Sequence, residues 1–224
     1  MLILCSLSFA GCMNLPASEI DAESGQISPT SGLLVGSVTQ TSDGIPESYH
    51  NEVGFVFRPA TDNNYSGFKS LRIKSAKIAR PLFEPNHSLA ERGLEKLNGK
   101  LFAVPVDPGA YKLECFYIDA PGYKYHCLEH PLAFEIRAGD IQYLGNLDAA
   151  FCIRHAYANQ YGIAGVALTI NDESGRDIPM LKDKYRSIRN VSIETRVLDN
   201  SAMQKQLGFQ SQCCTGEKKC TLDL

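Results

Sequence analysis

Apolar and polar residues alternate along four short segments in the middle of the chain. These segments are residues 101–106, 111–118, 132–136 and 141–147. Asp107-Pro-Gly-Ala separates the first two segments, and Arg137-Ala-Gly-Asp separates the last two. A period of two is expected of strands with one buried face, and turns containing Gly connect such strands at close range. The pattern therefore predicts antiparallel strands joined by tight turns at Gly109 and Gly139, with a loop at residues 119–131.

Further segments on both sides of this centre also have strand patterns. They are residues 32–39, 53–57, 71–78, 148–153, 162–170 and 191–197. Many short strands separated by turn residues favour two packed sheets over a helical fold. We therefore expect a mainly β protein, specifically an antiparallel β-sandwich of the transthyretin or immunoglobulin type.

One segment in the C-terminal half changes to the period of a helix. Leu181, Tyr185 and Ile188 share a stripe at helical spacing. Asp177 precedes Pro179 by two residues, which suggests that Asp177 is the N-cap and that Pro179 lies in the first turn. The basic residues of this segment lie off the apolar stripe: Lys182, Lys184 and Arg186. The sequence thus predicts a single helix that ends near Asn190 and is appended to the sandwich.

The chain length suits one domain with flexible ends. It has 224 residues, 44% hydrophobic content and a formal net charge of -3, which gives no electrostatic reason to expect a nucleic-acid partner. Residues 13–31 are rich in Ser, Pro, Ala and Glu without periodicity, so they are predicted to be a tether. The sandwich domain is predicted at 32–199, followed by a cysteine-bearing tail at 200–224.

The N-terminal twelve residues are apolar and end in Ala10-Gly-Cys12. This stretch resembles the lipobox of bacterial lipoprotein signal peptides, in which Cys12 would be the lipidated first residue after removal of the signal. Met13 stands where these lipoproteins carry Asp for retention in the inner membrane, so the resemblance implies the outer membrane. No Lys or Arg precedes Cys12, although a basic region normally opens a signal peptide. We therefore expect a start codon further upstream.

Cysteine usage fits export to an oxidising compartment. Six cysteines other than Cys5 and Cys12 are candidates for disulfides: Cys115, Cys127, Cys152, Cys213, Cys214 and Cys220. Cys115 and Cys127 flank the predicted loop and are expected to bond to each other. Tail cysteines are expected to pair within the tail and with the body of the protein, Cys152 being one candidate.

The alternative for the loop is a metal site. His126, Cys127 and His130, together with Cys115, supply four soft ligands for zinc or copper, although their spacing matches no common zinc pattern. Residues 171–177 are rich in oxygen ligands but do not fit a calcium loop, and they are better explained as a turn and a helix start. No cofactor or metal is therefore assigned.

Catalytic signatures are absent from the sequence. It has no Gly-x-Ser-x-Gly, and its five histidines are scattered. Tyr111, Tyr117 and Tyr143 alternate into predicted strands, so packing is the expected role of these side chains. We predict that the chain is not an enzyme.

Four segments resemble a family of small bacterial lipoproteins with a carboxypeptidase-regulatory or transthyretin-like sandwich. They are residues 32–38, 106–113, 138–147 and 172–185, and the resemblance extends over about 32–198. It implies a lipid-anchored cell-envelope protein with a structural or binding role and a possible envelope protein as partner. A periplasmic metal-handling protein that uses the Cys/His loop is the alternative.

Overall fold

The computed structural model describes residues 28–42, 52–61, 71–74, 78–79, 87–88, 93–94, 99–119, 124–155, 161–199 and 201. Eleven strands, one α-helix and one 3-10 helix lie in these ranges. The strands are β1 (Gly32–Ser42), β2 (Glu52–Pro59), β3 (Leu71–Lys74), β4 (Ile78–Ala79), β5 (His87–Ser88), β6 (Lys100–Val106), β7 (Gly109–Asp119), β8 (Lys124–Ile136), β9 (Ile141–His155), β10 (Tyr161–Asn171) and β11 (Glu194–Thr195). The helices are α1 (Ser174–Lys184) and η3 (Arg186–Ile188). The prediction of a mainly β chain with one α-helix is confirmed.

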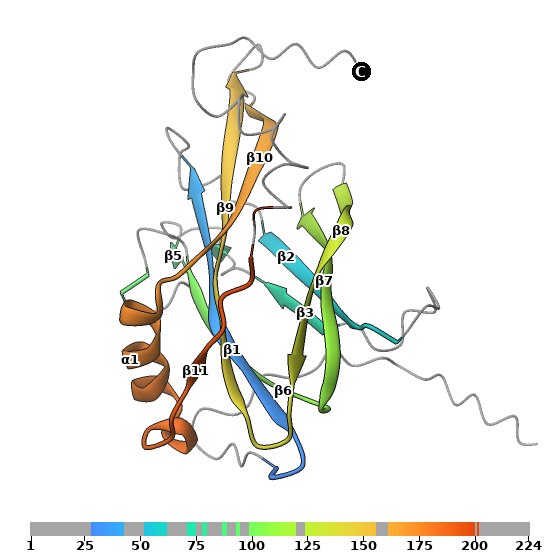
Figure 1. Cartoon of the computed structure of the whole chain (residues 1–224). Helices are drawn as coiled ribbons and strands as arrows, with labels where there is room; N and C mark the ends of the chain where they lie inside the picture. The colour runs from blue at the N-terminus through green and yellow to red at the C-terminus, as the bar shows by residue number, and fades with distance from the viewer. Residues whose placement is uncertain are drawn as a thin grey trace, which may run out of the picture.

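The strands form two principal sheets that face each other (Figure 1). The larger has the order β10-β9-β1-β6 with β11 beside β9, and the smaller has the order β3-β2-β7-β8. The expectation of purely antiparallel pairing is wrong, because β9 pairs in parallel with both β1 and β11. Tight turns in the sequence predict antiparallel neighbours. The paired residues of β1 and β9 are more than a hundred positions apart in sequence, so tertiary packing and not a turn brings these two strands together.

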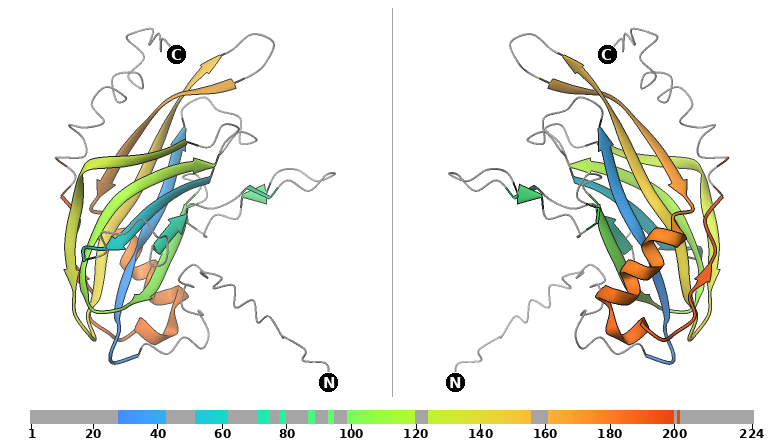
Figure 2. Two further views of the ribbon diagram at one scale, coloured as in Figure 1. Left: turned by 90° about the vertical axis from the view of Figure 1, so that its right-hand side faces the viewer. Right: turned by 90° about the vertical axis from the view of Figure 1, so that its left-hand side faces the viewer.

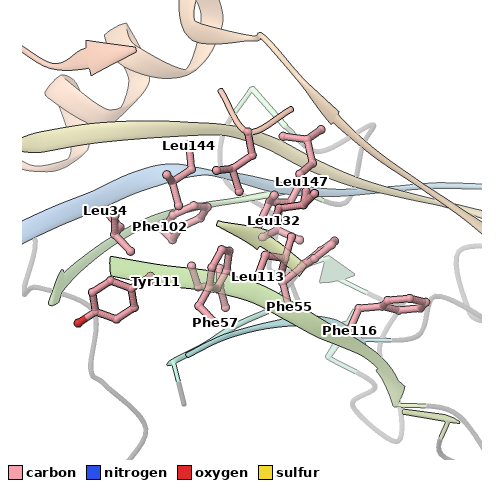
Figure 3. Close-up of a cluster of buried hydrophobic side chains, with 14 of the residues drawn as sticks. Leu34, Phe55, Phe57, Phe102, Tyr111, Leu113, Phe116, Leu132, Leu144 and Leu147 are labelled. Carbon is pink, nitrogen blue, oxygen red and sulfur yellow. The ribbon is translucent and has the colours of Figure 1, made fainter. Parts of the chain in front are cut away.

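The space between the sheets is filled by apolar side chains (Figure 3). Those of the larger sheet include Leu34, Phe102 and Leu144, and they meet Phe55 and Leu113 of the smaller sheet. Burying side chains of this size stabilises the fold by roughly 1.5–3 kcal/mol each. This core is what fixes the two sheets face to face.

A second apolar core lies on the other face of the larger sheet. Figure 2 shows α1 lying against this face. Leu33 and Val35 of β1 belong to it, whereas Leu34 and Val38 belong to the core between the sheets. β1 is therefore buried on both faces, which explains the uninterrupted apolar run from Leu33 to Val35 near its start. The predicted helical stripe of Leu181, Tyr185 and Ile188 lies in this second core, as its spacing required.

The predicted tight turns are confirmed. Gly109 and Gly139 have φ of 149° and 79°, which only glycine adopts without strain. A Tyr111 hydroxyl donates to the Asp107 carbonyl at 2.8 Å and ties the turn before β7 to that strand. Burial, and then the nearby Asp107 carboxylate, raise the pKa of Tyr111.

Several predicted boundaries differ from the structure. Residues 124–131, expected in a loop, belong to β8, and the separate segments 141–147 and 148–153 are one strand, β9. The strand expected at 191–197 is reduced to the two residues of β11. In the segment 71–78, β3 covers residues 71–74 and β4 begins at Ile78. Residues 75–77 lie outside the described residues.

The helix boundaries also need correction. Asp177 is not the N-cap, because α1 begins at Ser174 with Glu173 as its N-cap. The N–H of Ser174 donates to Asp172 Oδ1 at 3.0 Å, so the turn that starts the helix lies earlier than expected. α1 ends at Lys184, and η3 continues only to Ile188. Asp177 is thereby placed inside the helix, facing the sheet.

Candidate functional site

The most concentrated polar chemistry in the described chain surrounds the carboxylate of Asp177, between α1 and the larger sheet. Asp177 is 0% exposed. Its Oδ2 accepts hydrogen bonds from Ser37 Oγ at 2.5 Å and from the Tyr143 hydroxyl at 2.7 Å. Its Oδ1 accepts one from Arg176 Nε at 2.8 Å. Both carboxylate oxygens are therefore satisfied without solvent, as a buried charge requires.

A bulge in β9 brings two of its polar residues onto the face below α1. Val35 of β1 pairs with Tyr143, but Ser37, two residues later, pairs with Asn146. One extra residue is thus accommodated in β9 at Gly145, whose φ is 117°. Without it, Tyr143 and Asn146 would point to opposite faces, because successive strand residues alternate.

The bulge needs glycine on both strands. A Cβ at Gly145 would lie 2.7 Å from Ile170 Cγ2. A Cβ at Gly36 of β1 would lie 2.6 Å from the carbonyl oxygen of Gly145. The bulge is therefore built from this close approach of two backbones, and it positions the polar side chains for the site.

The hydrogen bonds continue from Asp177 along the face of the sheet. Asn146 Nδ2 donates to Ser37 Oγ at 2.7 Å. Thr39 Oγ1 lies 3.1 Å from Asn146 Oδ1 and 2.6 Å from Asp148 Oδ1. Thr39 has a single hydroxyl hydrogen, so these two acceptors share one proton. The set of Ser37, Thr39, Tyr143, Asn146, Asp148, Arg176 and Asp177 is called the α1–sheet network below.

Burial and charge act together on the titratable groups of this network. Burial raises the pKa of Tyr143 far above its ordinary value, and the adjacent Asp177 carboxylate raises it further because an ionised tyrosine there would repel it. The Arg176 guanidinium compensates the charge of Asp177 from the helix surface, with 28% of its side chain exposed. Tyr143 is consequently a neutral hydrogen-bond donor throughout the physiological range.

A serine hydroxyl on a carboxylate is also the geometry of a nucleophile and its base. Here, however, Ser37 is 0% exposed and its oxygen additionally receives the Asn146 N–H. A substrate could reach this oxygen only if α1 left the sheet. The arrangement is suited to holding α1 on the sheet in one register.

The predicted bond between Cys115 and Cys127 is present. The two residues face each other on β7 and β8, and their Cα atoms are 4.0 Å apart. Cys115 is buried on the outer face of the smaller sheet with Val56 and Tyr117, whereas Cys127 is exposed. Because the two sulfurs bind each other, neither is available as a thiolate ligand in this state. Within the described ranges, no group of three or more metal-ligating side chains is present.

The other residues singled out from the sequence are not brought together by the described structure. His130 is exposed on β8. The side chains of His126 and Cys152 lie outside what is described, although the backbone of both belongs to strands. The remaining predicted cysteines lie outside the described residues altogether: Cys12, Cys213, Cys214 and Cys220.

The oxygen-rich segment 171–177 forms a turn and the first turn of α1. The hydroxyl and the backbone N–H of Ser174 hold the pKa of Asp172 below its ordinary value. The reading as a turn is confirmed, whereas the role given to Asp177 was wrong. Sequence reasoning missed the partnership of Ser37, Asn146 and Asp177, although polar Ser37 and Thr39 at a spacing of two inside an apolar strand were a usable signal.

Among the described residues, none of the helices has the length and apolar character needed to cross a membrane. Comparisons with protein-family models, with curated proteins and with solved structures found no match for this chain.

Proposed function

We propose that the chain is a lipid-anchored protein of the bacterial cell envelope, exported to the outer membrane, with a non-enzymatic structural or binding role. The observation that carries the proposal is the Cys115–Cys127 disulfide. Disulfides of this structural kind persist in oxidising compartments and are rare in the cytosol. The lipobox-like sequence ending at Cys12 supplies the mode of attachment.

The strand order supports the transthyretin-like form of the sandwich over the immunoglobulin-like form. In immunoglobulin domains the first strand neighbours the second in the same sheet. Here β1 neighbours β6 and β9, and β2 lies in the other sheet between β3 and β7. Sandwiches of many families serve as binding or anchoring modules, so the specific role must be argued from the sites.

Within the residues that the structure describes, the α1–sheet network is the place that most resembles catalytic chemistry, and its geometry supports a structural role. Its serine is enclosed, and its carboxylate is saturated by three donors. A role in binding would instead use the exposed surface, with the network keeping α1 in a fixed position. No specific observation favours the metal-handling alternative. Two of its four expected ligands, Cys115 and Cys127, are bonded to each other in the disulfide.

The anchor is tested by acyl labelling in bacteria that express the full gene. Cells are fed an alkyne analogue of palmitate, and the immunoprecipitated protein is coupled to a fluorophore. The wild type should carry label, Cys12→Ser should carry none, and the matched control Cys5→Ser should be labelled like the wild type. An unlabelled wild type, or label that persists in Cys12→Ser, would refute the anchor.

A further inference from the structure

Three strands of the larger sheet start at the same end of the molecule. β1 and β11 both run parallel to β9, with Leu33 beside Ile141 and Glu194 beside Gln142. The segments that precede these strands therefore lie together: residues 28–31, the turn 137–140, and the connection from α1 to β11. Figures 1 and 2 show this gathering at one end of the ribbon.

The last turn of α1 and the connection from α1 to β11 are strongly basic. Their positive side chains are Lys182, Lys184, Arg186 and Arg189, against the single acid Asp183, in a chain whose formal net charge is -3. Arg189 Nε donates to the Lys182 carbonyl at 3.5 Å, which brings the Arg189 side chain back to the last turn of α1. In the part of the chain that the structure describes, Lys182, Arg186 and Arg189 form no ion pair.

An apolar residue stands beside these charges. Val191 is 40% exposed, and within the described ranges it is the one large hydrophobic residue in the exposed class. Neighbouring residues at the same end contribute Arg137 and Arg196 against Asp107, Asp140 and Glu194, so the positive excess is local to the last turn of α1 and the connection that follows it. We call Lys182, Lys184, Arg186, Arg189 and Val191 the basic tip.

We propose that the basic tip rests on the anionic phospholipid surface of the membrane that anchors the chain. Basic side chains are attracted to anionic headgroups, and an exposed apolar side chain close to them in sequence can enter the interface. This inference rests on the proposed lipid anchor, because the tip lies at the end where the chain enters β1. Fifteen residues lie between Cys12 and Ser28, and the tether predicted there from the sequence would span about 20 Å on average.

The tip then orients a domain that the lipid alone would leave free to tumble. Attraction to a charged surface falls off within a Debye length of about 8 Å in physiological salt. A tether that keeps the domain close to the surface supplies the effective concentration at which a weak contact is populated. The domain would stand with its basic tip on the bilayer and its opposite end directed away from it.

The test uses the full chain with Cys12→Ala, so that lipidation cannot mask a weak contact. The protein is sedimented with vesicles of phosphatidylglycerol and phosphatidylcholine, and separately with pure phosphatidylcholine. We expect binding to the anionic vesicles only, lost at high salt. Adding Lys182→Gln with Arg186→Gln should weaken binding roughly thirtyfold, and Val191→Ser should weaken it further.

The matched control is Lys100→Gln with Lys112→Gln, which removes the same charge from β6 and β7. This control should bind within twofold of its parent, and the unfolding midpoint is measured for every variant to confirm folding. Equal binding to both vesicle types, no binding to either, or equal losses in the tip and control variants would overturn the inference.

Acyl labelling of the wild type separates the two proposals. Selective binding by the basic tip without any acyl label at Cys12 would refute the anchor alone. Acyl label without selective binding would refute the basic tip alone.

Discussion

The Tyr143 hydroxyl on β9 donates a 2.7 Å hydrogen bond to Asp177 Oδ2 on α1, across 34 residues of sequence. This contact joins the only α-helix among the described residues to the middle of the larger sheet. Removing one member of a buried charged cluster is costly, because the partners left behind have already lost their water. The first two predictions follow from this relationship.

Replacing Asp177 by alanine should destabilise the protein by about 3–5 kcal/mol, because Ser37, Tyr143 and Arg176 all lose their acceptor. The change is measured by urea unfolding. Asp183→Ala is the matched control, since Asp183 is an exposed acid on the same helix and its loss should stay within about 0.5 kcal/mol. Similar midpoints for the two variants would show that the network does not hold α1.

Stability should fall in alkaline solution in a way that depends on Tyr143. The folded pKa of Tyr143 is raised above its ordinary value of 10.0, first by burial and then by Asp177. A group whose pKa is higher in the folded than in the unfolded protein contributes its full stabilisation of the fold below the unfolded pKa. This contribution is lost as the pH rises above the unfolded pKa. Above pH 10 the loss approaches about 1.4 kcal/mol per pH unit.

Tyr143→Phe should therefore lower stability at pH 8 but show a shallower decline between pH 10 and 11 than the wild type. Urea midpoints across this range provide the measurement. Parallel curves for the two proteins would contradict the assigned environment of Tyr143.

The tight turns depend on glycine for conformational reasons alone. A Cβ at Gly109 or Gly139 would meet nothing within 4 Å, yet both residues have positive φ. Replacing either with valine should cost about 1–3 kcal/mol of stability. Gly175→Ala is the matched comparison, because Gly175 lies in α1 with equal space and is expected to gain up to about 1 kcal/mol from helix propensity. Thermal melts of the three variants are the measurement. Lower melting temperatures for the Gly109 and Gly139 variants, but not for Gly175→Ala, would show that backbone strain causes the loss.

The disulfide should stabilise the hairpin of β7 and β8. It joins residues 12 apart, for which the loss of chain entropy in the unfolded state is worth about 3 kcal/mol. Peptide mapping without reduction should recover the peptides of Cys115 and Cys127 as one linked species. The variant with serine at both positions should unfold at lower urea concentration, and reductant should shift the wild type toward it. Free, alkylatable thiols at both positions in protein isolated from envelopes would refute the bond.

Local chemistry made much of the fold predictable. Period-two alternation identified strand segments, and Leu181, Tyr185 and Ile188 identified the buried stripe of α1 and η3. The Cys115–Cys127 pairing could be predicted because the turn signal after Cys115 indicates that the chain reverses there. The two cysteines do lie opposite each other on the antiparallel strands β7 and β8.

The site was not predictable in the same way. Asp177 and Pro179 carry the signal of a helix start, but Asp172 and Ser174 start α1 earlier and leave Asp177 one turn inside it. The pairing of Ser37 with Asn146 depends on the parallel contact of β1 with β9 and on the bulge at Gly145. Both arise from tertiary packing between distant segments, for which the sequence has no local pattern.

The most direct test of the role of the α1–sheet network is the double-mutant cycle of Tyr143→Phe and Asp177→Ala, measured by urea unfolding. A hydrogen bond to a charged acceptor is worth about 1.5–3 kcal/mol. The double variant should therefore be more stable than the sum of the single effects implies, by at least about 1 kcal/mol. Additivity within about 0.3 kcal/mol would contradict the account, because it would mean that Tyr143 and Asp177 do not interact in the folded protein.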